Sequence, residues 1–367
     1  MHRPALLLRL ALAAPVLLAQ APPTALDKAL QAPVTTAQKK TVVEGLAAKL
    51  TANYVFPEVA KKTGDALKAK LASGGYDGAG TRKAFMESLS EDLRTFGNDR
   101  HFRVRFDPEF KEDEDDDKPP TAKEREELRT MAAKRGYGLA KAEILPGNVG
   151  LLDLRGFGPT EAVGPALSAA MAMLSGTDAF ILDLRQNGGG SPETVAYLCS
   201  YFFDEGDGRH LNDIYNRPKD TTRQFWTVAV PGPRYGGTKP VWVLTSGRTF
   251  SGGEECAYDF QTQKRAVLVG ETTGGGANPG GGVTLGEGFI AFVPTGKAVN
   301  PITKTNWEHV GVKPDVAVPA ADALKVAHAA ALRRLAAAEK DPDAKARLED
   351  RAAKVERGEQ DPPRYGR

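Results

Sequence analysis

Residues 179–192 read AFILDLRQNGGGSP: an apolar run, a glycine-rich turn and a proline that can begin a helix. A short apolar run followed by a helical pattern also occurs over 149–174 and over 241–261. A fourth apolar run covers 266–269. Strands that alternate with helices imply right-handed parallel crossovers. The sequence therefore predicts an α/β domain, which we place at 146–340.

The region before this domain has helical patterns. Thr35 and Gln38 form a capping-box pattern at the start of an amphipathic run. Pro57 can begin a second helix, and a third apolar pattern ends at Gly97. We expect residues 35–110 to form an N-terminal helical domain.

Charged stretches flank the α/β domain. Residues 112–117 are all acidic, and a Lys/Glu/Arg-rich stretch follows. The acidic run lacks the glycine and the ligand spacing of a calcium loop. We therefore expect a solvated linker with some helix at 111–145. Apolar stretches alternate with glycines over residues 274–300, which is typical of hairpins. We expect residues 341–367 to be a charged, flexible tail.

The first 21 residues have the pattern of a signal peptide. Arg3 precedes an apolar stretch over 6–18, and 19–21 read AQA, a small-x-small cleavage pattern. The apolar stretch is too short to remain as a membrane-spanning helix. We expect residues 1–21 to be removed and the chain to be exported, either periplasmic or secreted. A disordered N-terminus without export is the alternative.

Composition and charge exclude several classes of function. The chain has 367 residues, and Lys+Arg at 49 against Asp+Glu at 47 leave a net charge of +2, which does not favour nucleic acid. The 5 histidines are scattered, and Cys199 and Cys256 lack metal-ligand spacing. We expect no metal and no cofactor. The two cysteines could pair in an oxidising compartment or remain buried thiols.

A serine stands between a predicted strand and a predicted helix. Residues 245–255 read TSGRTFSGGEE, which puts the Ser251 hydroxyl at the carboxyl end of a strand, where open α/β sheets bind ligands. The two glycines after it allow close backbone approach, and the start of a helix offers free N–H groups to an anion. Alternatively, Ser251 and Glu254 form only a capping box.

Two further segments can supply chemistry. The glycines at 188–190 can free backbone N–H groups for an oxyanion or a phosphate, although no P-loop ending follows and a plain tight turn is equally consistent. His101 lies in the sequence NDRHF at 98–102. A neutral imidazole can take a proton from a serine, although a lone histidine is more often structural.

Taken together, these segments resemble the tail-specific (C-terminal processing) serine proteases. The similarity rests on DLRQNGGG, TSGRTFSGGEE, GETTGGG and GVKPDVAV, in that order, and spans roughly residues 35–335. The sequences NYVFPEVA and NDRHF are similar to the branch that contains tricorn core proteases and interphotoreceptor retinoid-binding protein. The resemblance implies a crotonase-like (ClpP/crotonase) α/β core, an N-terminal helical domain and peptide-bond hydrolysis.

The resemblance also implies roles for individual residues. Ser251 matches the family's nucleophile, and the backbone N–H groups of Gly252 and Gly189 match its oxyanion hole. The better-known processing proteases have a catalytic lysine in the strand exit, where this chain has Gly276. That departure rules out their serine–lysine dyad.

In the tricorn-like branch, a histidine takes the place of the catalytic lysine as the base, and an acid orients the histidine. His101 matches the base and Glu308, in the sequence NWEH, matches the orienting acid, while His309 is a weaker rival base. The segment between His101 and the strand at 149 is too short for the peptide-binding PDZ domain that those proteases usually carry.

The sequence thus predicts an exported serine endopeptidase that acts on polypeptides by a Ser-His-Glu type acyl-enzyme mechanism. The rival from another class is a non-catalytic carrier of a hydrophobic, retinoid-like ligand on the same fold. An acyl-CoA reaction on a related core is disfavoured because no CoA-binding pattern is visible.

Overall fold

A computed structural model of the chain describes residues 24–112 and 120–359. The predicted signal peptide and most of the acidic run lie outside the described residues. In the described part of the chain, no helix is both long and apolar enough to cross a membrane.

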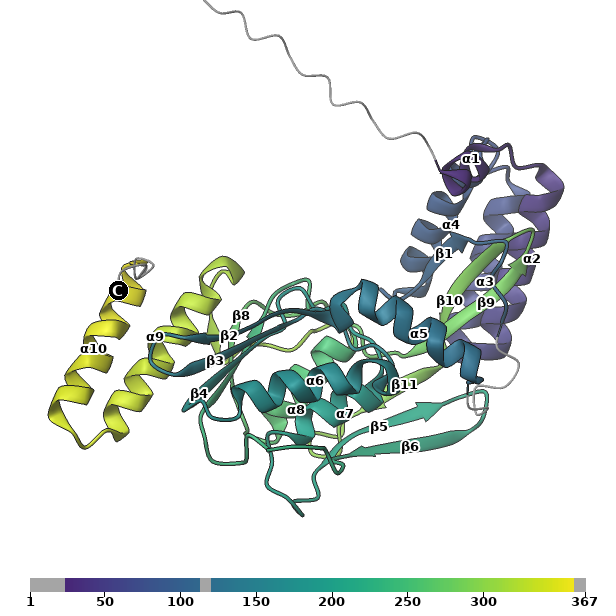
Figure 1. The fold of residues 1–367 in the computed structure, drawn as a ribbon. Coiled ribbons are helices and arrows are strands. Elements are labelled where there is room, and N and C mark those ends of the chain that lie inside the picture. The colour runs from purple at the N-terminus through teal and green to yellow at the C-terminus, as the bar shows by residue number, and fades with distance from the viewer. Residues whose placement is uncertain (1–23, 113–119, 360–367) are drawn as a thin grey trace, which may run out of the picture.

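A six-stranded sheet forms the centre of the α/β domain (Figure 1). Its strand order is β12-β8-β7-β4-β3-β2, and every neighbouring pair is parallel except β2 with β3. The predicted α/β class and its parallel strands are therefore confirmed. The strands are β2 (Leu139–Leu145), β3 (Val149–Leu154), β4 (Ala179–Asp183), β7 (Val241–Thr245), β8 (Val267–Gly270) and β12 (Val316–Ala317).

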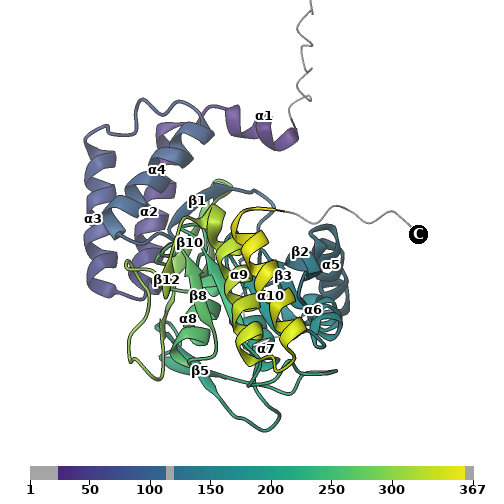
Figure 2. The ribbon, with the colours of Figure 1, turned by 90° about the vertical axis from the view of Figure 1, so that its left-hand side faces the viewer.

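Helices cover both faces of this sheet (Figures 1 and 2). Successive side chains of a strand point to opposite faces, so Leu152 and Leu182 pack with one set of helices while Leu151 and Ile181 pack with the other. The first set contains α6 (Thr160–Leu174), α7 (Pro192–Ser200) and α8 (Gly252–Thr262). The second contains α9 (Ala320–Ala338) and α10 (Pro342–Glu356).

The N-terminal lobe combines segments that are far apart in the sequence. Its helices are α1 (Ala25–Gln31), α2 (Thr36–Asn53), α3 (Pro57–Ala72) and α4 (Arg82–Gly97). They pack on an antiparallel sheet, β1-β10-β9, in which β1 (Arg103–Phe106) pairs with β10 (Phe289–Pro294) and β10 with β9 (Gly280–Gly286). The expected hairpin therefore exists, but it completes the N-terminal lobe, so residues 35–110 are not a separate domain.

Two other expectations about the chain's organisation were wrong in part. Helix α5 (Ala122–Lys134) agrees with a linker containing some helix, but it is followed by a 3₁₀ turn (Gly136–Gly138) and by β2, which is a strand of the central sheet. The tail also contains α10, whose Leu348, Ala352 and Val355 pack in the core cluster of α9. A narrow apolar stripe in a strongly charged segment is easily mistaken for a solvated tail.

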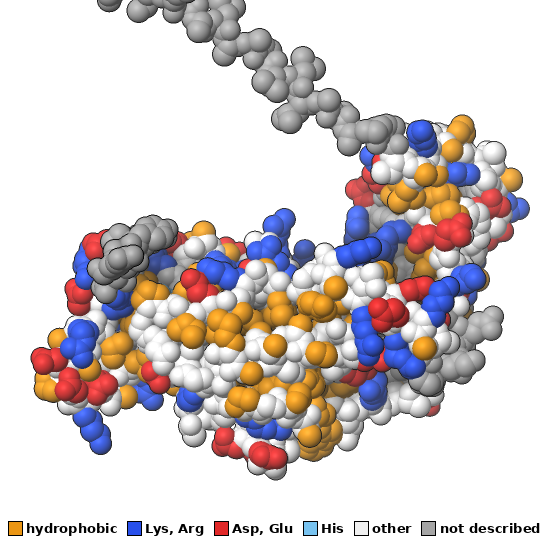
Figure 3. Space-filling model, in the orientation of Figure 1, with side chains coloured by type: hydrophobic (Ala, Val, Ile, Leu, Met, Phe, Trp, Pro, Cys, Tyr) orange, Lys and Arg blue, Asp and Glu red, His pale blue; other side chains and the backbone are white. Residues whose placement is uncertain are grey.

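A third sheet lies beside the central one. Its order is β11-β5-β6, formed by β11 (Gly296–Val299), β5 (His210–Asn216) and β6 (Thr221–Trp226). Hydrophobic side chains gather on the face that carries α5, α6 and the β5–β6 ribbon (Figure 3). Met131, Met173 and Trp226 of these elements are exposed.

We predict that Phe289→Ala unfolds the N-terminal lobe before the α/β domain. The Phe289 ring lies edge-on to Phe85 at 5.6 Å and to Phe106 at 5.2 Å between ring centroids, so its removal leaves a cavity that costs about 3–5 kcal/mol. Hydrogen exchange should then lose protection throughout α2 and α4. Met173→Ala, at an exposed position, is the control and should change stability by less than about 0.5 kcal/mol. Loss of protection confined to the β9–β10 hairpin would contradict the prediction.

Candidate active site

Ser251 is held in a backbone conformation that L residues rarely adopt. It follows the loop after β7 and is the N-cap residue of α8, with φ 53° and ψ −122°. The carboxylate of Glu254, which is fully buried, accepts a hydrogen bond from the Ser251 N–H at 2.9 Å. The structure thus contains the Ser251–Glu254 pairing of the capping pattern, in the turn that connects β7 with α8.

Glu254 also binds the strand exit after β8. Its carboxylate accepts hydrogen bonds from the Thr273 hydroxyl at 2.5 Å, from the Gly275 N–H at 2.6 Å and from the Gly276 N–H at 2.9 Å. Burial raises the pKa of Glu254, and the hydrogen bonds act in the opposite direction. This carboxylate fixes the serine turn to the strand exit that contains Gly275 and Gly276.

The glycine turn at 188–190 packs directly against Ser251. A Cβ atom on Gly189, whose φ is +97°, would lie 2.7 Å from the Cβ of Ser251. A Cβ atom on Gly190 would lie 1.9 Å from the Phe157 carbonyl oxygen. Only glycine fits at either position, and the structure brings the two predicted segments together.

One predicted oxyanion donor has to be corrected. The Gly189 N–H donates to the side-chain oxygen of the buried Asn187 at 2.8 Å, so it is not available to a substrate. The N–H groups of Gly190 and Gly252 donate no hydrogen bond to any described residue. Both glycines line a pocket together with Ser251.

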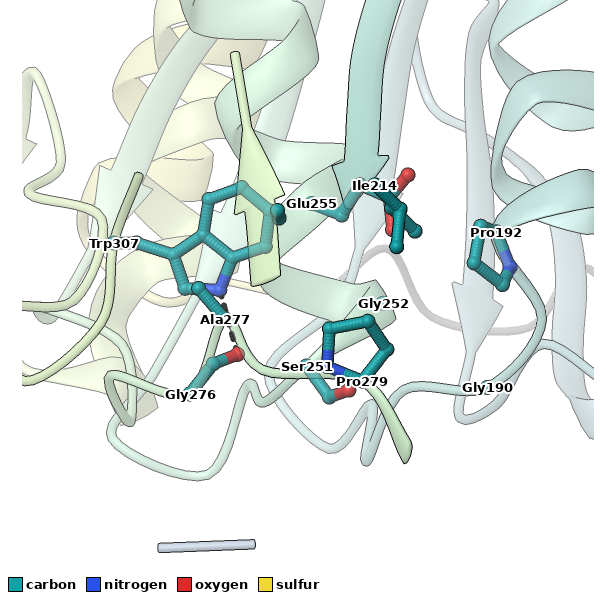
Figure 4. Close-up of a pocket in the computed structure, with 11 residues that line it drawn as sticks. Gly190, Pro192, Ile214, Ser251, Gly252, Glu255, Gly276, Ala277, Pro279 and Trp307 are labelled. Carbon is teal, nitrogen blue, oxygen red and sulfur yellow. Dashed lines mark hydrogen bonds between the residues drawn. The ribbon is translucent and has the colours of Figure 1, made fainter. Parts of the chain in front are cut away.

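This pocket is small, with a volume of about 20 Å³, and both polar and apolar groups line it (Figure 4). The Trp307 ring forms one wall and donates its indole N–H to the Gly276 carbonyl at 2.7 Å. Glu255 lies beside Ile214 in the view of Figure 4, and burial raises the pKa of Glu255 to about 7. The remaining lining residues are Pro192, Ala277, Pro279 and Ala298.

His101 lies next to the serine turn. Its ring contacts that of Phe250, the residue before Ser251, with 4.6 Å between centroids. A Cβ atom on Gly276 would come within 2.7 Å of His101 Cε1 and still closer to the Phe250 ring. The space that a side chain at position 276 would need is therefore occupied by His101 and Phe250. The Nε2 atom of His101 is buried without a hydrogen-bond partner among the described residues.

Asp99 is the acid in contact with His101. Its Oδ1 accepts a hydrogen bond from the His101 backbone N–H at 2.9 Å and lies 3.4 Å from His101 Nδ1. Its Oδ2 accepts from the Tyr54 hydroxyl at 3.2 Å and from the Asn278 amide at 2.9 Å. Burial acts to raise the pKa of Asp99, but the hydrogen bonds from His101 and Asn278 outweigh it and hold the pKa below its usual value. Sequence reasoning missed this residue, although the spacing Asp-x-His was visible.

Glu308 is placed differently from the expectation. Its carboxylate accepts a hydrogen bond from the Ala277 N–H, and its other oxygen lies 3.6 Å from Nδ1 of the half-exposed His309. Among the contacts of the described residues, none joins Glu308 to His101. Burial and the nearby Asp99 charge raise the pKa of Glu308 to about 8.

The described residues contain no group of three or more His, Cys, Asp or Glu side chains that could hold a metal ion. The chemistry that the site offers is that of a serine hydroxyl, an imidazole, two backbone N–H groups and a small pocket. This set is suited to nucleophilic attack on a carbonyl group.

Known peptidases are similar to this chain in sequence. The family described as peptidase family S41 matches residues 148–318, and the N-terminal domain of peptidase S41 in eukaryotic IRBP matches residues 23–135. Carboxyl-terminal-processing peptidase 1, chloroplastic, of Arabidopsis thaliana is 30% identical over 190 residues, which are 52% of this chain and 37% of that protein. Carboxy-terminal processing protease CtpA of Bacillus subtilis is 27% identical over 188 residues, with coverage of 50% and 38%. The chain thus spans about two fifths of the length of these relatives.

Solved structures share the fold. A lipoprotein from Streptococcus agalactiae superposes with a TM-score of 0.51 and 13% identity, over 83% of this chain and 98% of that one. The tricorn protease superposes with a TM-score of 0.50 and 12% identity, over 87% of this chain and 37% of that one.

We predict that Glu308→Gln removes part of the pH dependence of stability. Between about pH 4.5 and pH 8 the unfolded chain has released the Glu308 proton while the folded chain keeps it, so the free energy of unfolding falls as the pH rises. Glutamine cannot ionise and can still accept from Ala277. At pH 8 the free energy of unfolding of the variant should exceed that of the wild type by on the order of 2 kcal/mol, after allowance for solvent screening. Near pH 4 the two proteins should have the same free energy of unfolding.

Urea denaturation at several pH values measures this difference. Glu126→Gln, on the exposed face of α5, is the control. Its free energy of unfolding should differ from that of the wild type by the same amount at all pH values. If the difference for Glu308→Gln is also the same at all pH values, the carboxyl of Glu308 is not a buried, protonated group.

Proposed function

The chain belongs to peptidase family S41, and from this premise we propose that it is an exported serine endopeptidase that cleaves polypeptides through an acyl-enzyme. The observation that carries the proposal is the contact between the Ser251 turn and the glycine turn at 188–190, next to a pocket. The proposal includes a crotonase-like core without a PDZ domain, and export by the N-terminal segment.

In the first half-reaction Ser251 attacks the peptide carbonyl. His101 Nε2 accepts the hydroxyl proton while the Ser251 oxygen bonds to the carbonyl carbon, whose oxygen becomes an anion. The N–H groups of Gly252 and Gly190 would stabilise this anion, with Gly190 in place of the predicted Gly189. The C–N bond then breaks, and the imidazolium returns its proton to the leaving amine.

In the second half-reaction water replaces the amine. His101 removes a proton from the water, whose oxygen attacks the acyl carbon, and the Ser251 oxygen leaves with that proton. Each missing oxyanion donor typically costs about 10²–10³ in rate, which is why the close backbone approach at Gly190 and Gly252 matters.

His101 is supported as the base by its burial and by the contact of its ring with Phe250, the residue before Ser251. A lysine would be the alternative base, and Lys297 on β11 represents that alternative; it pairs with Tyr215 in the sheet.

We predict that Ser251→Ala abolishes peptide hydrolysis while the protein remains folded. The change removes one hydroxyl from a turn that glycines and Glu254 hold in place. Labelling with a fluorophosphonate and mass spectrometry of the labelled peptide check the assignment, and Ser175→Ala, at the far end of α6, is the control. A wild-type protein that is not labelled but binds apolar ligands would support the carrier alternative instead.

We predict that His101→Ala loses at least about 10³-fold in kcat/KM, because the serine then has no base. Lys297→Ala should keep turnover near that of the wild type. Assays on a peptide library and on casein measure both variants. Near-wild-type turnover of His101→Ala, or loss of turnover in a folded Lys297→Ala, would refute the assignment of the base.

A further inference from the structure

We propose that Asp99, and not Glu308, is the residue that positions His101 for catalysis. The inference rests on the proposed function. It assigns the positioning role to Asp99, two residues before His101, instead of to Glu308, which the family resemblance implied.

Asp99 contacts His101, its near neighbour in the sequence, at two atoms: the backbone nitrogen and the ring Nδ1. One oxygen of Asp99 accepts the His101 backbone N–H at 2.9 Å and faces the ring Nδ1 at 3.4 Å. Catalytic hydrogen bonds are often long in a free enzyme and shorten in the complex with substrate. At this distance Nδ1 forms no hydrogen bond with any residue that the structure describes. Donation of Nδ1–H to Asp99 in the complex with substrate would leave the lone pair of the neutral ring on Nε2, the nitrogen that must accept the serine proton.

The second oxygen of Asp99 is fixed from two sides of the molecule. Tyr54, the C-cap residue of α2, donates its hydroxyl at 3.2 Å, and Asn278, just before β9, donates its amide at 2.9 Å. Asp99 is 1% exposed, so these donors take the place of water around the charge. Burial and Asp99 raise the pKa of Tyr54, which therefore remains a donor.

Glu308 is unsuited to the role because of its surroundings. It has one backbone donor and one oxygen without a hydrogen-bond partner, whereas Asp99 has three donors. Two carboxyl groups that share a buried site do not both ionise readily, and the one with more hydrogen-bond donors takes the charge. The negative charge therefore lies on Asp99, and Glu308 keeps its proton near neutral pH. Glu308 then supports the segment at Ala277 that lines the pocket.

The test compares Asp99→Asn with Glu308→Gln, two changes that remove a carboxyl and keep its shape. We expect kcat of Asp99→Asn to fall by about 10²–10⁴ with KM changed by less than about threefold, because the ring loses its preferred tautomer. Glu308→Gln should stay within about tenfold of the wild type. Ser251→Ala should be inactive in the same assay, which establishes separately that the hydrolysis belongs to this site.

A spectroscopic measurement separates positioning from a merely structural role. In protein labelled with ¹⁵N-histidine, the chemical shifts of the neutral His101 ring should report a protonated Nδ1 and a bare Nε2 in the wild type. Asp99→Asn should mix the two tautomers, while Glu308→Gln should leave them unchanged. His101→Gln identifies the signals.

Three outcomes would overturn the proposal while Ser251 remains the nucleophile. They are an Nε2–H tautomer in the wild-type protein, a kcat of folded Asp99→Asn within tenfold of the wild type, and a larger loss in Glu308→Gln than in Asp99→Asn. The first of these needs no variant, so it decides the question even if Asp99→Asn does not fold. By contrast, full activity in Ser251→Ala would refute the proposed function itself.

Discussion

The carboxylate of Glu254 is the interaction on which the site depends. It is fully buried and accepts hydrogen bonds from the Ser251 N–H, the Thr273 hydroxyl and the N–H groups of Gly275 and Gly276. The cost of burying a carboxylate is offset only when several donors surround it, so the serine turn and the strand exit must form together. Thr273 in turn accepts the Val312 N–H at 2.7 Å. Three of the motifs recognised in the sequence are thus parts of one hydrogen-bonded unit.

Close backbone contact is the second constraint. The serine turn and the glycine turn at 188–190 approach so closely that a methyl group on Gly189 would overlap Ser251. Such contact sets the direction of the free N–H groups before any substrate arrives, which is what electrostatic preorganisation requires. Because Asn187 binds the Gly189 N–H and the Leu154 carbonyl, the turn is also fixed to the central sheet.

Local patterns in the sequence predicted the strands and helices of the α/β domain, because apolar periodicity and glycine or proline punctuation are local signals. The grouping of Ser251, the glycine turn and His101 into one predicted site came instead from the resemblance to a protease family. The role of Asp99 could not be predicted in this way, since it depends on Tyr54 and Asn278, which are distant in sequence. Likewise, the choice between two adjacent glycines as oxyanion donor depends on a side-chain hydrogen bond. Helix α10 was missed because its apolar stripe is narrow and its partner is another helix.

The β9–β10 hairpin has a consequence for the way in which the protein is made. Strand β1 pairs with β10, and the register joins residues about 190 positions apart. At about 5–20 residues per second, a ribosome completes β10 some 10–40 s after it has released β1. During that interval the first helices expose the apolar surface that Phe289 later covers. The amino-terminal lobe therefore acquires its final structure only after most of the chain has been synthesised.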